Sequence, residues 1–278
     1  MPTQPIVESK QQAERHALHE SHEQLYKAWS HHARHCPHGE VIERPEVLIA
    51  SANVQWFVFN TAFLPAPACS EQELEEAVAA ATDYFTRQGR RWMLVLSEDR
   101  LAGALRPRAR QVLDGLGLSP MFSLTGMVAE RLAPARRPPP ELEVREMADA
   151  EERQHLSDLN AISHEVPLAW GRELLGWEGL YEGNGRGYVG YCQGEAVSGA
   201  AVFALEGVSY VAVVATRPEY RRRGFAEAVL RHGLAEARRS WGLERTVLHA
   251  SEVGYQLYLH LGYRPVARFQ FYLAATQA

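Results

Sequence analysis

The sequence predicts an α+β protein with a mixed, mostly antiparallel sheet flanked by helices, arranged as two pseudo-repeated domains. Three observations lead to this prediction. Apolar, β-branched runs alternate with stretches of helical periodicity along most of the chain. The order strand, helix, strand, helix, strand over residues 54–128 repeats the order over residues 208–273. A proline-rich stretch separates the two halves.

That stretch holds four prolines between residues 133 and 140. Proline has no backbone N–H and continues neither a helix nor a central strand, so an extended spacer is expected. We therefore predict a domain over 1–132, a linker over 133–140 and a second domain over 141–278.

The elements of the second domain follow from periodicity and from capping residues. Asp149 is placed to cap a helix, the turn at Gln193-Gly194-Glu195 joins two strands, and Gly242 ends a long amphipathic helix. We expect strands at 142–147, 188–192, 196–205, 208–215, 245–249 and 266–273, and helices at 149–163, 225–241 and 252–261.

The first domain opens with a polar helical stretch at residues 8–35. The capping box Ser70-Glu-Gln-Glu73 then predicts a helix that runs to Gly89. The remaining expected elements are strands at 47–50, 54–60, 92–96 and 122–128 and a helix at 106–116.

Seven of the twelve histidines lie between His16 and His38. The pairs His19/His22 and His31/His35 have spacings that suit zinc. Further ligands in a recurring geometry are missing, so we interpret the segment as a solvated helix and predict no metal site.

Composition excludes several classes of protein. A length of 278 residues with 46% hydrophobic residues suffices for packed cores. The net charge of −5 disfavours a nucleic-acid partner, and no apolar run is long enough for a membrane span. Three widely spaced cysteines make a disulfide framework improbable and favour a reducing, cytoplasmic location. Of these, Cys192 is expected to be structural.

The most informative stretch runs from Val211 to Ala226, where an apolar strand leads into a basic turn and a long helix. The first N–H groups of a helix lack intrahelical partners, and the positive end of the helix dipole points the same way. Gly224 lets an anion approach the backbone, and three arginines precede it. The stretch therefore predicts a phosphate or pyrophosphate site.

A second motif lies further along the chain, where Leu257-Tyr258-Leu-His-Leu-Gly262-Tyr263 ends a short helix before the last strand. Together with Arg221-x-x-Gly224-x-Ala226, it resembles the GCN5-related N-acetyltransferase (GNAT) superfamily. The resemblance covers residues 141–273 and implies the acyl-CoA N-acyltransferase fold.

The resemblance implies an N-acetyltransferase that uses acetyl-CoA as co-substrate and acts by direct attack in a ternary complex. Tyr258 would be the general acid for the departing thiolate, because a phenol is protonated at neutral pH. The cofactor-binding residues it implies are Val214, Ala215, Thr216, Arg221, Arg222, Arg223, Gly224, Phe225 and Ala226.

The acceptor is expected to be a primary amine of a small molecule or peptide. Glu165, Trp170 and Glu206 are the candidate residues for binding it, although both glutamates also suit exposed surface charges. Neither nucleic acid nor membrane is expected as a partner, and a homodimer is compatible with the sequence.

The first domain resembles a degenerate copy of the second. Leu116 to Pro120 aligns with Leu261 to Pro265 without a gap, which puts Leu113 at the position of Tyr258. No Arg-x-x-Gly-x-Ala occurs between Asn60 and Ser70. The alternative function is a non-catalytic acyl-CoA-binding sensor or regulatory protein, which needs the cradle but no acid.

Overall fold

The computed structural model describes residues 4–275, with side chains from residue 11 onward, and its strands form one continuous sheet. The sheet order is β1-β2-β3-β4-β11-β5-β10-β9-β8-β7-β6. The strands are β1 (Glu40–Glu43), β2 (Leu48–Ser51), β3 (Asn60–Phe63), β4 (Met93–Ser97), β5 (Leu118–Ala129), β6 (Glu143–Glu146), β7 (Gly185–Cys192), β8 (Glu195–Leu205), β9 (Val208–Thr216), β10 (Thr246–Ala250) and β11 (Arg264–Ala274).

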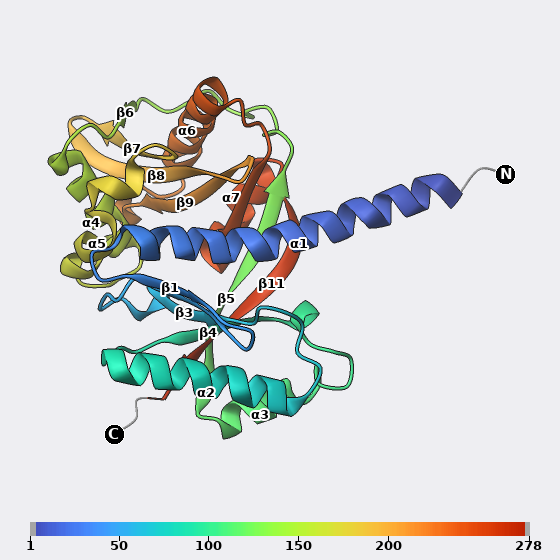
Figure 1. Ribbon diagram of the computed structural model, residues 1–278. Helices are drawn as coiled ribbons and strands as arrows, with labels where there is room; N and C mark the ends of the chain where they lie inside the picture. The colour runs from blue at the N-terminus through green and yellow to red at the C-terminus, as the bar shows by residue number, and fades with distance from the viewer. Residues whose placement is uncertain (1–3, 276–278) are drawn as a thin grey trace.

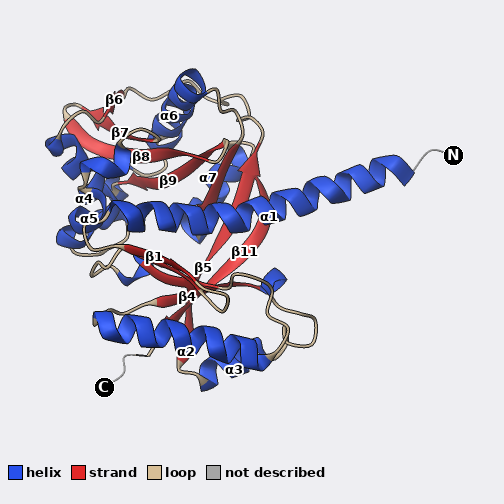
Figure 2. Ribbon diagram, in the orientation of Figure 1, coloured by secondary structure: helices blue, strands red, loops and turns tan. Residues whose placement is uncertain are grey.

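Within residues 4–275, β3–β4 and β9–β10 pair in parallel, and the other neighbours run antiparallel. Helices lie on both faces of the sheet (Figure 2). The predicted α+β class with a mixed, mostly antiparallel sheet is thus confirmed. The helices are α1 (Gln4–His35), α2 (Glu71–Gln88), α3 (Ala109–Gly115), α4 (Ala150–Ser163), α5 (Leu168–Leu175), α6 (Phe225–Trp241) and α7 (Glu252–His260).

The alternation of side chains along each strand divides the core between the two faces. In β4, Val95 packs in the cluster that includes α1, α4 and α5, whereas Leu94 and Leu96 pack in the cluster of α2 and α3. Helices α6 and α7 cover the same face as α2 and α3 in the second half of the chain. Helix α1 runs between the two halves on the opposite face (Figure 1).

The predicted helix boundaries are held by the expected caps. The Asp149 carboxylate accepts the N–H of Glu152 at 2.9 Å, and the Ser70 hydroxyl accepts that of Glu73 at 3.2 Å. Gly242 ends α6 in the left-handed conformation, with φ of 70°.

The two halves of the chain exchange their last strands. Strand β5, which ends the first half, pairs with β10 of the second half through Thr246↔Ala129 to Ala250↔Thr125. Strand β11, the last of the described strands, pairs with β4 of the first half. The two exchanged strands also pair with each other over most of their length. The halves are therefore repeats in element order, yet each depends on a strand from the other.

One strand expected in the first half is wrong. The strand expected at 54–60 is a loop with a short 3₁₀ turn, η1 (Phe57–Phe59), and β3 begins only at Asn60. The Asn60 side chain, which is fully buried, donates to the carbonyls of Val54 and Arg91 and so ties this loop to the start of β4. The short elements β1 and α5 were not predicted.

The helix expected at 8–35 is confirmed as α1, but its solvated character is not. His31 and His32 are 5% and 2% exposed and pack against Phe203 of β8. Burial lowers the pKa of both rings to about 4, so both are neutral at pH 7. The histidines thus belong partly to the core between the two halves.

Candidate functional site

The candidate site lies where β9 and β10 separate. The two strands pair through Ser209↔Thr246, Tyr210↔Val247 and Val211↔Leu248, and the pairing then stops although β9 continues to Thr216. Residues 212–216 therefore present an edge of β9 that no part of β10 covers. An unpaired strand edge of this kind can accept an extended chain as an added strand.

A β-bulge marks the point of separation. The register between β8 and β9 shifts between Gly199/Ala201, and Val213 adopts φ of 56°. A β-branched residue in the left-handed region is strained, and such outliers gather at functional sites. The bulge turns β9 away from β10 and makes room between the strands.

The turn after β9 is the segment that the sequence predicts to be an anion cradle, and we refer to it as the cradle. Arg222 and Gly224 both have positive φ, 64° and 86°. Among the described residues, no protein acceptor is found for the backbone N–H groups from Arg222 to Ala226; the first intrahelical bond of α6 runs from the N–H of Ala228 to Gly224. These donors lie at the positive end of a 17-residue helix.

The three arginines of the turn have different surroundings. Arg221 donates to the Thr216 carbonyl at 3.2 Å and to the Ser163 carbonyl at 3.4 Å, so it ties the turn to β9 and to the end of α4. The Arg223 guanidinium stacks over the rings of Tyr220 and Phe225. Arg222 is exposed. Arg221 thus shapes the cradle in this structure, while the other two remain available to an anion.

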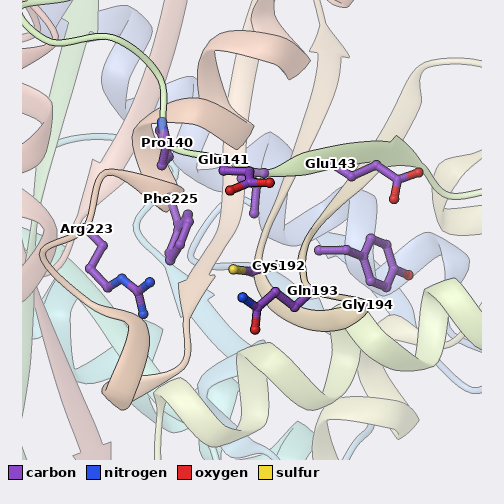
Figure 3. Close-up of a pocket in the computed structure, with 10 residues that line it drawn as sticks. Pro140, Glu141, Glu143, Cys192, Gln193, Gly194, Arg223 and Phe225 are labelled. Atoms are coloured by element: carbon purple, nitrogen blue, oxygen red, sulfur yellow. The ribbon is translucent and has the colours of Figure 1, made fainter.

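A cavity of about 560 Å³ borders the cradle on the side of the linker and the β7–β8 turn (Figure 3). Arg223 and Phe225 line it together with Pro140, Glu141 and Cys192. Neither Tyr258 nor Val214 to Thr216 borders this cavity, so it is distinct from the gap between β9 and β10. Its lining includes residues of the cradle but none from the uncovered edge of β9.

Tyr258 projects from α7 into the apolar cluster beside the gap. It packs with Val211, Leu248 and the partly buried Val214 and is 8% exposed. Burial raises the pKa of its phenol well above the usual value, so the group stays protonated across the physiological range. The predicted acid and the strand edge therefore lie in one cluster, on the face that α6 and α7 cover.

The acceptor candidates are only partly brought together. Glu165 is exposed in the loop after α4, two residues beyond Ser163, whose carbonyl contacts Arg221. Trp170 lies on α5 and packs on the core of the α1 face. Glu206 lies in the β8–β9 turn, at the opposite end of β9 from the cradle, and pairs with Lys27 of α1. The structure thus does not bring Glu206 to the site.

His249 is a residue that sequence reasoning missed. It is the first β10 residue beyond the segment that pairs with β9. Its Nδ1 lies 3.0 Å from the hydroxyl of Tyr210. Its Nε2 lies 3.1 Å from the carbonyl of Ser21. The deep position lowers its pKa to about 3, so the ring is neutral. The contact with α1 spans 228 positions, and no local pattern indicates it.

Other kinds of site find little support in the described part of the chain. No group of three or more His, Cys, Asp or Glu side chains there could hold a metal ion. None of the helices described is long and apolar enough to cross a bilayer. The three cysteines are free, and Ser251, which begins α7, accepts the N–H of Gly254 as a helix cap.

The chain is similar to known proteins in sequence over its C-terminal half and in fold over most of its length. Residues 143–266 match the family model described as an acetyltransferase (GNAT) domain. A GCN5-related N-acetyltransferase from Kribbella flavida is 18% identical, with a TM-score of 0.66 over 86% of this chain and 90% of that chain. One from Sphaerobacter thermophilus is 13% identical, with a TM-score of 0.56 over 84% and 75%.

A tandem GNAT protein from the clavulanic acid biosynthesis pathway is 14% identical, with a TM-score of 0.52 over 78% of this chain and 76% of that chain. At these identities the solved structures show a shared fold. No curated protein matches the chain.

Proposed function

Because the C-terminal half of this chain belongs to the GNAT acetyltransferase superfamily, we propose that the protein transfers the acetyl group of acetyl-CoA to a primary amine of a small molecule or peptide. The reaction is direct attack in a ternary complex. The observation that carries the proposal is the run of unpartnered backbone N–H groups from Arg222 to Ala226, directly after the uncovered edge of β9.

These features suit the two ends of the co-substrate. The cradle at the start of α6 would hold the pyrophosphate through backbone N–H groups, with added charge from Arg222 and Arg223. The edge of β9 over Val214, Ala215 and Thr216 would pair with the amides of pantetheine as an added strand. A backbone N–H at the bulge would polarise the thioester carbonyl.

In the chemical step, the amine nitrogen forms a bond to the thioester carbon, and the carbon–sulfur bond breaks. The departing sulfur takes the phenolic proton of Tyr258, and the proton released by the amine goes to water. The phenolate then regains a proton from solvent. Burial favours the neutral phenol, which keeps Tyr258 in the form that can donate.

The amine is proposed to approach along the end of β9 beside Glu165 and Trp170. A carboxylate at this position attracts an ammonium and accepts its hydrogen bond, while an indole offers an apolar surface. This arrangement favours an amine with an apolar body.

One observation favours the alternative function, a non-catalytic acyl-CoA sensor. Helix α1 lies close over β5 and β10: a Cβ added to Gly126 would lie 2.0 Å from the Ser21 hydroxyl oxygen, and His249 contacts the Ser21 carbonyl. A helix over this face leaves less room for an acceptor amine, which suits binding better than turnover. Retention of the buried Tyr258 beside the strand edge favours the enzyme.

Thiol release separates the two functions. Acetyl-CoA is held fixed while a panel of alkyl, aryl and peptide amines is supplied, and free coenzyme A is measured. Turnover that depends on one class of amine supports the transferase. Saturable binding of acetyl-CoA without turnover on any amine would establish the sensor instead.

A further inference from the structure

A second cavity, of about 270 Å³, lies in the first half of the chain beneath α1. Its apolar walls include Leu48, Phe63, Val95 and Phe269, and Arg100 and His22 line it as well. We refer to the cavity lined by these six residues as the N-terminal pocket. It borders neither the cradle of the second half nor Tyr258.

The N-terminal pocket lies where β3 and β4 separate. These strands pair in parallel from Thr61↔Met93 to Phe63↔Val95 and then separate. The chain segments that follow them meet again at the isolated bridge Ala68↔Leu101. In the pseudo-repeat, β3 and β4 correspond to β9 and β10. The pocket is thus the counterpart of the gap at the candidate active site, but the later bridge closes its far end.

Arg100 is the charged group that distinguishes this pocket. Its side chain is half-buried, and its Nη1 donates to the Pro65 carbonyl at 3.3 Å. Its Nε donates to Nδ1 of His22 at 3.4 Å. Among the described residues, it forms no ion pair with a carboxylate, and no acceptor contacts its Nη2. Burial lowers its pKa, which shows the cost of leaving this cation partly desolvated.

The nearby carboxylate of Asp99 is already engaged. Because Nδ1 of His22 accepts from Arg100, Nε2 carries the proton and donates to Asp99 at 3.1 Å. The hydroxyl of Ser97 donates to the same Asp99 oxygen at 2.8 Å. This chain of hydrogen bonds fixes the His22 ring and leaves one side of the guanidinium for another acceptor.

Glu23, Lys27 and Glu43 also line the pocket. Glu23 pairs with Lys27 at 3.2 Å, and Glu43 accepts the Tyr26 hydroxyl at 3.0 Å. These two carboxylates in the lining disfavour a ligand with a second negative group. A ligand with one anionic group for Arg100 and an apolar body for the apolar walls fits the lining.

We propose that the N-terminal pocket binds a small monocarboxylate, with its carboxylate on Arg100 and its apolar body against Leu48, Phe63 and Phe269. A guanidinium matches the planar geometry of a carboxylate and forms charge-assisted hydrogen bonds with it. The site is independent of acetyl transfer and gives the degenerate half a binding role of its own.

The test uses the full chain saturated with coenzyme A, titrated with pentanoate and benzoate and with the uncharged pentanamide and benzamide. Ligand-observed NMR or calorimetry measures the affinity. We expect at least one carboxylate to bind with a dissociation constant of about 1 mM. Its amide should bind at least about tenfold more weakly, because the charge-assisted hydrogen bonds are lost.

Two variants locate the site, and one serves as control. Arg100→Gln removes the cation, whereas Arg87→Gln removes an exposed arginine of α2 that pairs with Asp83. Leu48→Trp fills the apolar wall without touching the guanidinium. We expect Arg100→Gln and Leu48→Trp to abolish carboxylate binding and Arg87→Gln to leave it unchanged.

Either of two results would overturn the proposal. One is that neither carboxylate binds the unmodified chain more tightly than its amide. The other is that a folded Arg100→Gln or Leu48→Trp chain retains the affinity of the unmodified chain. The titration measures carboxylate binding and does not require turnover of any amine. Failure of the proposed transferase and failure of the proposed pocket are therefore distinguishable.

Discussion

At the scale of single residues, the hydroxyl of Tyr258 has the most specific role in the proposed reaction. Tyr258→Phe removes the proposed acid and keeps the ring in its apolar cluster. We expect turnover to fall by about 10²-fold, the lower end for a positioned acid, because a thiolate is already a fair leaving group. Acetyl-CoA affinity should change little.

Steady-state kinetics with an active amine measures this effect. Tyr255→Phe is the matched control, because Tyr255 lies on the same helix and packs at the edge of the same cluster. Equal rates for Tyr258→Phe and the parent chain at neutral and alkaline pH would assign the hydroxyl to packing.

Gly224 holds the cradle in a backbone conformation that favours glycine. Its φ is 86°, and a Cβ placed on it would lie 3.7 Å from Pro140, which is an ordinary contact. A side chain here costs about 1–2 kcal/mol of stability through the left-handed backbone. A bulky one would also occupy the proposed position of the pyrophosphate.

Gly224→Trp should therefore abolish the single acetyl-CoA site expected per chain. Gly242→Trp is the control, because Gly242 has φ of 70° at the other end of α6 and faces open space. It should show a similar loss of stability with normal binding. Calorimetry that finds two sites, or full affinity in Gly224→Trp, would contradict the proposed cradle.

At the scale of elements, α3 carries a packing residue at the position where α7 carries the proposed acid. Leu113 is fully buried in the cluster formed with α2, at the position that Tyr258 has on α7. Leu113→Ala should lower the free energy of unfolding by about 2–5 kcal/mol through lost burial and a cavity. The rate per folded molecule should stay the same. A loss of turnover with an unchanged melting curve would show that this half takes part in the reaction.

We expect a buried histidine of helix α1 to make the fold sensitive to acid. The pKa of His32 is about 4 in the folded chain, below the usual 6.5, so the unfolded chain binds a proton first as the pH falls. The stability contributed by the neutral ring is present above pH 6.5 and is lost between 6.5 and about 4, at roughly 1.4 kcal/mol per pH unit.

His32→Phe should reduce this acid sensitivity, because phenylalanine fills the same site beside Phe59 and Phe203 without titrating. His19→Phe is the control, because His19 is 66% exposed on the same helix. Denaturant unfolding at pH 7 and at pH 5 measures the difference. Equal acid sensitivity in His32→Phe and the parent chain would mean that this ring does not set it.

At the scale of the whole molecule, local patterns predicted most elements but not their partners. The caps at Asp149 and Ser70 and the period of α6 are local signals, and the structure agrees with them. The contact of His249 with Ser21 joins distant segments. Periodicity along the chain carries no information about such a contact.

The exchange of β5 and β11 could not be predicted either, because it also depends on contacts between distant segments. Both are amphipathic strands that follow a short helix, and either edge of the sheet would bury their apolar faces. Pairing is decided by the fit of the whole sheet, which a repeat in sequence leaves open. The cradle was predictable because its strand, turn, glycine and helix are consecutive in the chain.

Because the halves exchange strands, we expect the linker to be dispensable for holding them together. Residues 133–140 connect them covalently, but the ladders β5–β10 and β4–β11 join them by strand pairing in the interior of one sheet.

A protease site inserted between Arg136 and Arg137 allows the folded chain to be cut there. The cut halves should co-elute on size exclusion at micromolar concentration and separate only in denaturant. Each half alone would leave long strand edges exposed and should aggregate. Halves that separate in native buffer and stay folded would show that each half completes its own sheet.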